Sequence, residues 1–310
     1  MGPQDARPAS STPVLVDLRG GRLPWRDVAV ALEGGPEVRF LRVGRHRPPV
    51  HLLACVDRSI LGLDRLRRAP QRQLAWFVET PAERWAQRLA SQAHRFRRFL
   101  TCDSRLLALG EPFERFHFGT SWVAACSEPK TRVVSMVSSL RAKLEGHRFR
   151  LQALERARLR GVECFGKGHR PVASKHEALA AYAFSVAVEN CRQDEYFTEK
   201  LIDCFLCETV PIYWGFPSLG SVFDPRGVLA FTSLDELDAH LASLSLERYA
   251  ALRPQVLENK RRVLALGLDG PGFWRRAAGV MVREAAGLEP AREPWPGRWR
   301  LMRALRAPWA

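Results

Sequence analysis

The sequence predicts an α/β protein built on parallel sheets with helices on both faces. Short runs of β-branched and aromatic residues alternate with amphipathic segments along most of the chain, the pattern of repeated strand–helix–strand units. Pairs such as Gly34-Gly35 and Pro48-Pro49 separate the runs. The 310 residues are enough for two domains. Two such units side by side place a ligand site between the carboxyl ends of their strands.

The N-terminal half reads as a series of short strands. The expected strands are Val14–Leu18, Val28–Leu32, Val38–Val43, His51–Val56, Leu74–Val78, Phe99–Thr101 and Trp122–Ala125. After Leu74–Val78 a helix is expected, with Thr80 as its N-cap, Pro81 at its first position and Glu83 as the capping-box acid. No GxGxxG or P-loop sequence occurs, so a dinucleotide or NTPase site of those types is not supported.

Glu79 follows an apolar strand, where α/β folds place functional groups. Partial burial would raise the pKa of its carboxyl group and make it a usable general base. The other interpretation is an acid that simply favours a helix start, and this is the commoner role of a first-turn acid. The residues alone favour the second interpretation.

The C-terminal half continues the alternation. Its expected strands are Val133–Val137, Val162–Phe165, Tyr182–Val188, Val210–Trp214 and Val228–Phe231. Its expected helices are His147–Arg160, Ser174–Leu179, Leu234–Leu244, Leu246–Leu266 and Gly272–Ala286, the last taken as the final helix of this domain.

The segment Tyr182–Asp224 is the most informative part of the chain. A polar loop, Cys191–Phe197, joins the strand Tyr182–Val188 to a helix that Thr198 is placed to cap. A strand end followed by a helix N-terminus is a common site for phosphate-bearing ligands. Lys200, in the first turn, suits a negatively charged ligand.

Charge and cysteine content narrow the class of protein. The net charge of +15 attracts anions in general, but no nucleic-acid-binding motif accompanies it. The basic, Trp- and Leu-containing tail Trp295–Ala310 suits either an amphipathic helix on an anionic membrane or a helix packed on the protein itself.

Seven cysteines with no secretory signal favour reduced thiols and a cytoplasmic location. The pair Cys204 and Cys207 is better explained by packing than by metal binding, because no second pair follows it.

The segment Tyr182–Asp224 resembles the C-terminal signature of glycosyltransferase family 10, the α1,3/α1,4-fucosyltransferases. The matching pieces are YAFSVAVEN, a tyrosine two residues before TEKL, VPIYWG and the pair FD. Weaker similarity covers SMVSSL, GHRFR, GVECFGKG and GVLAF, and upstream WFVETP, FLTCD and SWV. Cys191 departs from the family, in which Ser or Thr often follows the asparagine, and this leaves the donor base and sugar less secure than the fold.

The resemblance implies a GT-B fold, in which two Rossmann-like domains face each other across a cleft. We then expect a disordered segment at 1–12, an acceptor-side domain at 13–130, a nucleotide-sugar-binding domain at 131–287 and a basic tail at 288–310. The implied reaction is transfer of L-fucose from GDP-fucose to a glycan hydroxyl with inversion, in an α1,3-type linkage. It implies no cofactor and no metal.

The resemblance also implies roles for individual residues. Glu79 would be the general base, which reverses the preference from the residues alone. The donor-binding set would be Arg148, Asn190, Tyr196, Glu199 and Lys200, with Arg150 and Glu189 as further candidates. Arg148 is the first choice for the phosphate-binding arginine and Arg150 the second, because the alignment there is uncertain by one or two residues.

Two alternatives remain open. One is a transferase of the same family that uses another nucleotide sugar. The other, from a different class, is a non-catalytic basic protein that binds nucleic acid or membrane through its charge and tail. The expected partners of the enzyme are the nucleotide sugar and a glycan acceptor, with peripheral contact of Trp295–Ala310 with an anionic membrane and no specific nucleic acid.

Overall fold

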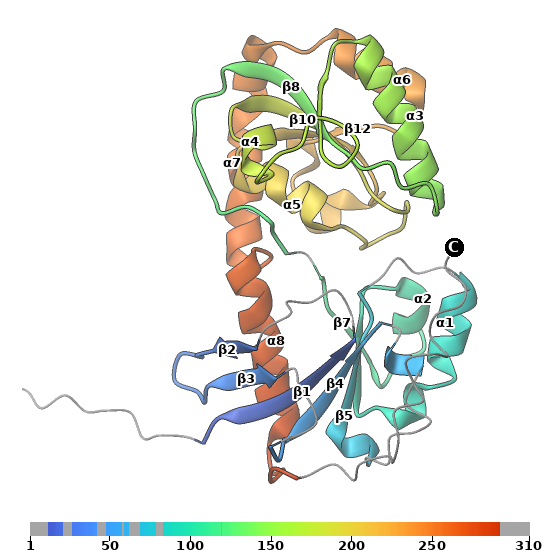
Figure 1. The fold of residues 1–310 in the computed structure, drawn as a ribbon, viewed down its shortest axis with the longest axis vertical. Helices are drawn as coiled ribbons and strands as arrows, with labels where there is room; N and C mark the ends of the chain where they lie inside the picture. The colour runs from blue at the N-terminus through green and yellow to red at the C-terminus, as the bar shows by residue number, and fades with distance from the viewer. Residues whose placement is uncertain are drawn as a thin grey trace, which may run out of the picture.

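Two parallel sheets organise the computed structural model, which describes residues 12–20, 27–41, 48–57, 59–61, 69–78, 83–118 and 120–291 (Figure 1). The first sheet has the order β2-β3-β1-β4-β5-β6-β7, and only the β2–β3 pair is antiparallel. Its strands are β1 (Val14–Gly20), β2 (Val28–Val30), β3 (Val38–Leu41), β4 (Leu52–Val56), β5 (Gln73–Trp76), β6 (Arg98–Thr101) and β7 (Phe113–Arg115).

The second sheet is parallel throughout, with the order β12-β11-β10-β8-β9. Its strands are β8 (Arg132–Val137), β9 (Glu163–Phe165), β10 (Tyr182–Val188), β11 (Val210–Trp214) and β12 (Leu229–Ala230). The α-helices of the described residues are α1 (Glu83–Ala90), α2 (Ser104–Leu107), α3 (Glu145–Leu159), α4 (His176–Leu179), α5 (Glu199–Leu206), α6 (Leu234–Ala242), α7 (Leu246–Ala265) and α8 (Gly270–Ala285).

Helices cover both faces of each sheet, which confirms the predicted α/β class. In β10, Phe184, Val186 and Val188 point to a core that includes α3, α6 and α7. Ala187, on the opposite face, belongs to the core built by α5. Because both faces are covered, β10 is buried along its whole length, as expected for a central parallel strand.

Helix α8 packs on the first sheet, not on the second. Its residues Phe273, Ala277 and Met281 share one face and join the core of β1, β3, β4 and β5. The Phe273 ring stacks on Trp76 of β5, with centroids 5.5 Å apart and an interplanar angle of 11°. Figure 1 shows α8 running along the first sheet, at the bottom of the view, whereas α7 packs on the second sheet above it. This corrects the assignment of the last helix to the domain at 131–287: its apolar face predicts burial but does not say against which sheet.

The connection between the sheets also differs from the prediction. Trp122–Ala125 is not a strand; the Trp122 N–H donates to the side chain of Asp203 at 2.8 Å and its indole is exposed. The seventh strand of the first sheet is instead β7, three residues long and not predicted. Such a short strand leaves almost no alternation to detect in the sequence.

Several predictions fall outside the described residues. These are the disordered segment apart from its last residue, Glu79, the cap at Thr80-Pro81 and the tail Trp295–Ala310. Among the helices that the structure describes, none is long and apolar enough to span a bilayer.

Candidate functional site

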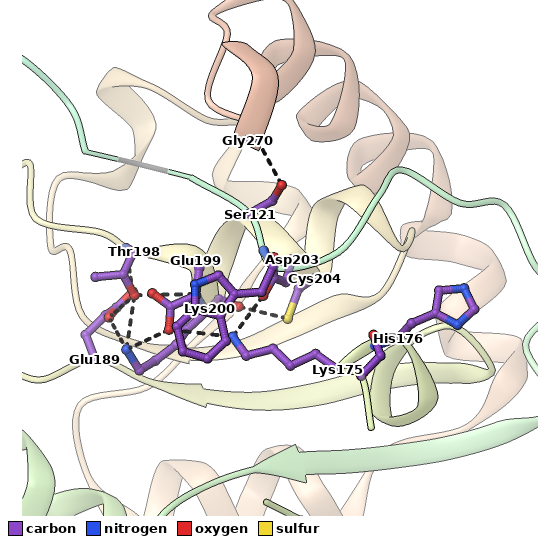
Figure 2. Close-up of polar contacts among 12 residues, drawn as sticks. Ser121, Lys175, His176, Glu189, Thr198, Glu199, Lys200, Asp203, Cys204 and Gly270 are labelled. Carbon is purple, nitrogen blue, oxygen red and sulfur yellow. Dashed lines mark hydrogen bonds and ion pairs between the residues drawn. The ribbon is translucent and has the colours of Figure 1, made fainter. Parts of the chain in front are cut away.

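Glu189 is the buried anchor of the predicted site. It directly follows the central strand β10, and its side chain is fully buried. One carboxylate oxygen accepts the Thr198 N–H at 2.9 Å and the other accepts the Thr198 hydroxyl at 2.7 Å. Thr198 in turn caps α5, accepting the N–H of Lys200. The carboxylate at the strand end therefore fixes the position of the helix N-terminus (Figure 2).

Lys200 holds its ammonium group among oxygen atoms at this helix start. Its Nζ lies 3.4 Å from Glu189, 3.5 Å from Glu199 and 3.1 Å from the Thr198 hydroxyl. Burial works against the charge, but the two carboxylates outweigh it and raise the pKa of Lys200. The group is therefore a fixed cation at neutral pH, next to backbone N–H groups that also favour an anion.

Glu199 lies between two ammonium groups. Its Oε1 is 3.5 Å from Lys200 and 3.5 Å from Lys175. Burial opposes the charged form, but these two neighbours dominate and lower the pKa of Glu199 to about 2. Glu199 is therefore ionised at neutral pH and can only accept hydrogen bonds, as a ligand for hydroxyl groups must.

An ion pair between Lys175 and Asp203 adjoins Glu199, and it was not predicted from the sequence. The Lys175 Nζ is 2.8 Å from Asp203, whose side chain is buried, and stands 4.3 Å from the centre of the Trp122 ring. Figure 2 shows Lys175 reaching from beside His176 towards Glu199 and Asp203. Burial raises the pKa of Asp203 above its ordinary value, although Lys175 acts against this. The available signal was a single acid, Asp203, among the apolar residues of α5.

Asn190 and Arg150 join the cluster from the other side. The Arg150 side chain, on α3, donates to the Asn190 side chain at 3.3 Å, and the Gly146 N–H donates to the Asn190 carbonyl at 3.2 Å. A Cβ at Gly146 would lie 2.4 Å from the Glu189 carbonyl oxygen, so only glycine permits this approach of α3. Arg150 is buried, and within the described residues its Nε has no hydrogen-bond partner.

Helix geometry distinguishes the two candidates for the phosphate-binding arginine, Arg148 and Arg150. Arg148 is exposed, whereas Arg150 is buried beside Asn190. Residues two apart on a helix point to nearly opposite faces, so both cannot serve one site. The second-choice arginine, Arg150, is the one that lies with the donor-binding candidates.

Tyr196 and Cys191 lie in the loop between β10 and α5. Tyr196 is buried. Its phenol lies close enough to Arg150 to affect the pKa of that guanidinium. Burial lowers the pKa of Arg150, whereas Glu189, Glu199 and Tyr196 raise it. Burial, followed by the charge of Glu189, raises the pKa of Cys191 to about 12, so this residue is a neutral thiol at neutral pH.

The same loop contacts the first sheet, and no local pattern in the sequence predicts this contact. Glu195 pairs with Arg115 of β7 at 2.9 Å and has a positive φ of 62°. The His117 ring stacks on Phe197, with centroids 5.2 Å apart. Burial, with help from Arg276 and Arg115, lowers the pKa of His117 to about 4 and keeps it neutral. The donor-side loop is thus tied to the end of the first sheet.

Glu79 itself lies outside the described residues, but the strand that leads to it is placed. The chain is described to Val78, whose N–H donates to the Asp57 carboxylate at 2.8 Å just beyond the end of β5. Glu79 is the next residue along the chain, and its role as general base stays a prediction.

Comparison with known proteins identifies the family. Residues 126–252 match the model of the C-terminal part of glycosyltransferase family 10 (fucosyltransferase). The chain carries a glycosyltransferase family 10 domain. This match confirms the resemblance seen in Tyr182–Asp224, which lies within it.

Two curated fucosyltransferases are similar to about a third of the chain. The chain is 37% identical over 106 residues to the α-(1,3)-fucosyltransferase FucT of Helicobacter pylori, which is 33% of this chain and 21% of that protein. It is 31% identical over 103 residues to an α-(1,4)-fucosyltransferase of Arabidopsis thaliana, which is 30% of this chain and 26% of that protein. The matched regions thus span about a quarter or less of these curated relatives.

Solved structures extend the likeness to most of the chain. A crystal structure of an α1,3-fucosyltransferase matches with a TM-score of 0.53 at 15% identity, covering 84% of both chains. A structure of an α1,3-fucosyltransferase with GDP matches with a TM-score of 0.54 at 14% identity, covering 92% of this chain and 93% of the other. At such identities the likeness establishes the fold alone. The chain therefore has the GT-B fold, with two Rossmann-like units, that the resemblance implied.

Proposed function

We propose that this family 10 chain is an inverting glycosyltransferase that transfers L-fucose from GDP-fucose to a hydroxyl group of a glycan, in an α1,3-type linkage. The observation that carries the proposal is the cluster of Arg150, Glu189, Asn190, Glu199 and Lys200 at the carboxyl end of β10. The curated relatives are α-(1,3)- and α-(1,4)-fucosyltransferases, which supports transfer of fucose.

The cluster has the donors that a nucleoside diphosphate requires. Lys200 and the N-terminal turn of α5 would bind the pyrophosphate, and the buried Nε of Arg150 offers a further oriented donor. The ionised Glu199 would accept hydrogen bonds from the ribose hydroxyls. Asn190 and Tyr196 would line the rest of the donor pocket.

In this mechanism Glu79 removes the proton from the acceptor hydroxyl. The hydroxyl oxygen attacks the anomeric carbon from the face opposite the nucleotide, and the bond from that carbon to the phosphate oxygen breaks. The electron pair leaves with GDP, whose growing negative charge Lys200 and Arg150 stabilise. These cations supply the charge compensation for the leaving group, so the proposed transfer requires no metal.

The second candidate is a family 10 transferase with another nucleotide sugar as donor. The observation in its favour is Cys191, a neutral thiol next to Asn190 where the family often has a hydroxyl residue. A thiol is a weaker hydrogen-bond donor and acceptor than a hydroxyl group and would recognise a sugar or base differently.

The proposal is tested by release of GDP. The purified full chain is incubated with GDP-fucose and a panel of β-linked galactose and N-acetylglucosamine acceptors, and GDP and the glycan product are both measured. We expect acceptor-dependent GDP release with formation of a fucosylated product. Acceptor-dependent turnover of a UDP-sugar in place of GDP-fucose would support the second candidate instead.

A further inference from the structure

The linker between the two sheets, which joins β7 to β8, is held against the C-terminal end of α5 by hydrogen bonds. The Cys126 N–H donates to the Leu206 carbonyl at 3.0 Å, and its own carbonyl accepts from the Lys260 ammonium at 2.7 Å. These bonds determine where the side chains that follow in the linker point, and they have no part in the donor cluster described above.

Three metal-binding side chains meet at this place. One ligand atom each from Cys126, Glu128 and His176 lies within 4.8 Å of the others. Nε2 of His176 is already 2.8 Å from Oε1 of Glu128. Both of these side chains are well exposed, so an ion from solvent can reach them. Thiolate, imidazole and carboxylate are the ligand types that Zn²⁺ takes in proteins.

Cys207, at the end of α5, is hydrogen-bonded to the Cys126 thiol but does not belong to this group of ligand atoms. It is therefore a neighbour of the cluster and not a member of it.

The charges of the three side chains suit a divalent cation. One thiolate and one carboxylate carry two negative charges, which Zn²⁺ would balance. The nearby ammonium groups are engaged elsewhere: Lys130 donates to the Cys207 and Ala180 carbonyls, both at 2.6 Å, and Lys260 is paired with Glu208 at 2.9 Å.

We propose that Cys126, Glu128 and His176 form a zinc site that fastens the linker to α4. Three protein ligands leave the fourth tetrahedral position to a water molecule. Typical zinc–ligand bonds of about 2.0–2.3 Å place tetrahedral ligands about 3.5 Å apart, so side-chain rotations of the three clustered ligands would close the site. The site lies apart from the transfer chemistry, although His176 directly follows Lys175.

The test is a zinc titration of the full chain, purified with a reductant and stripped with a chelator. Competition against a chromophoric chelator gives stoichiometry and affinity, and Co²⁺ substitution reports thiolate ligation through its charge-transfer absorption. We expect one Zn²⁺ per chain at sub-micromolar affinity and cobalt–thiolate absorption. We expect Cys126→Ser and His176→Gln each to weaken zinc binding at least 10-fold.

Matched controls separate this site from other thiols and imidazoles. Cys164→Ser on β9 and His240→Gln on α6 remove residues of the same types outside the cluster and should bind zinc as the wild type does. Thermal unfolding without metal checks that each variant is folded. The proposal is overturned if the wild type binds no zinc in this range, if Cys126→Ser keeps the wild-type affinity, or if the controls lose it equally.

Discussion

The Lys200 ammonium lies 3.4 Å from the buried carboxylate of Glu189, between the first turn of α5 and the end of β10. The neighbouring pairs of Lys175 with Glu199 and Asp203 extend this contact into a network of alternating charges. Positive and negative side chains nearly balance there, so general electrostatic attraction is weak at short range. Binding of a diphosphate should therefore depend on oriented donors, namely Lys200, Arg150 and the helix N-terminus.

Replacement of the two candidate arginines should give opposite results. Arg150→Ala removes a buried donor beside Asn190 and should weaken GDP binding about 10- to 100-fold, the usual effect of losing hydrogen bonds to a charged group. Arg148→Ala, on the exposed face of the same helix, is the matched control and should bind GDP as the wild type does. Isothermal titration calorimetry measures both. Loss of binding only in Arg148→Ala would reverse the assignment.

The ionisation of Glu199 should appear in the acid stability of the chain. Its pKa falls from an ordinary 4.5 to about 2 on folding, so its ion pairs stabilise the folded state fully above pH 4.5. That contribution, at most about 3 kcal/mol, is lost as the pH falls towards 2. Glu199→Gln should therefore have a flatter dependence of unfolding free energy on pH in this window. Denaturant unfolding at several pH values measures it, and identical slopes for the two proteins would contradict the low pKa.

Much of the donor-side architecture could be predicted because its signals are local. The strands Tyr182–Val188 and Val210–Trp214 and the Thr198 cap agree with the structure, since uninterrupted runs and a capping residue mark them in the sequence. Contacts between residues far apart in the sequence have no such local signal. Examples are the packing of α8 on the first sheet and the pair of Glu195 with Arg115.

The choice between Arg148 and Arg150 shows a second limit. A resemblance uncertain by two residues leaves both arginines possible, and only the orientation of α3 separates the exposed one from the buried one. The ion pair of Lys175 with Asp203 is similar, because the sequence shows an acid among apolar residues of a helix but does not show which cation pairs with it.

The base assignment is tested by Glu79→Gln. Amide nitrogen and oxygen cannot accept the acceptor proton at neutral pH, so transfer should fall at least 1,000-fold while GDP affinity stays unchanged, in keeping with the loss of a general base. Glu111→Gln, an exposed glutamate of the first sheet's β6–β7 connection, is the control and should remain active. Normal turnover by Glu79→Gln would remove it from the mechanism.

Membrane contact through the tail is tested by deletion of Trp295–Ala310. Basic amphipathic segments bind anionic lipid through charge and buried apolar side chains. We expect the full chain to sediment with phosphatidylserine vesicles in low salt and the truncated chain to stay in solution. Equal sedimentation of the two chains would show that the tail packs on the protein instead.

Binding of a nucleotide panel to the wild type and to Lys200→Ala tests the proposed GDP site. Calorimetry with GDP, UDP and CMP should show micromolar binding of GDP only, weakened at least 10-fold by Lys200→Ala and unchanged by Lys167→Ala, an exposed lysine after β9. Thermal unfolding of each variant separates lost contacts from lost folding. Binding of UDP or CMP in preference to GDP, or full GDP affinity in a folded Lys200→Ala variant, would contradict the proposed donor site.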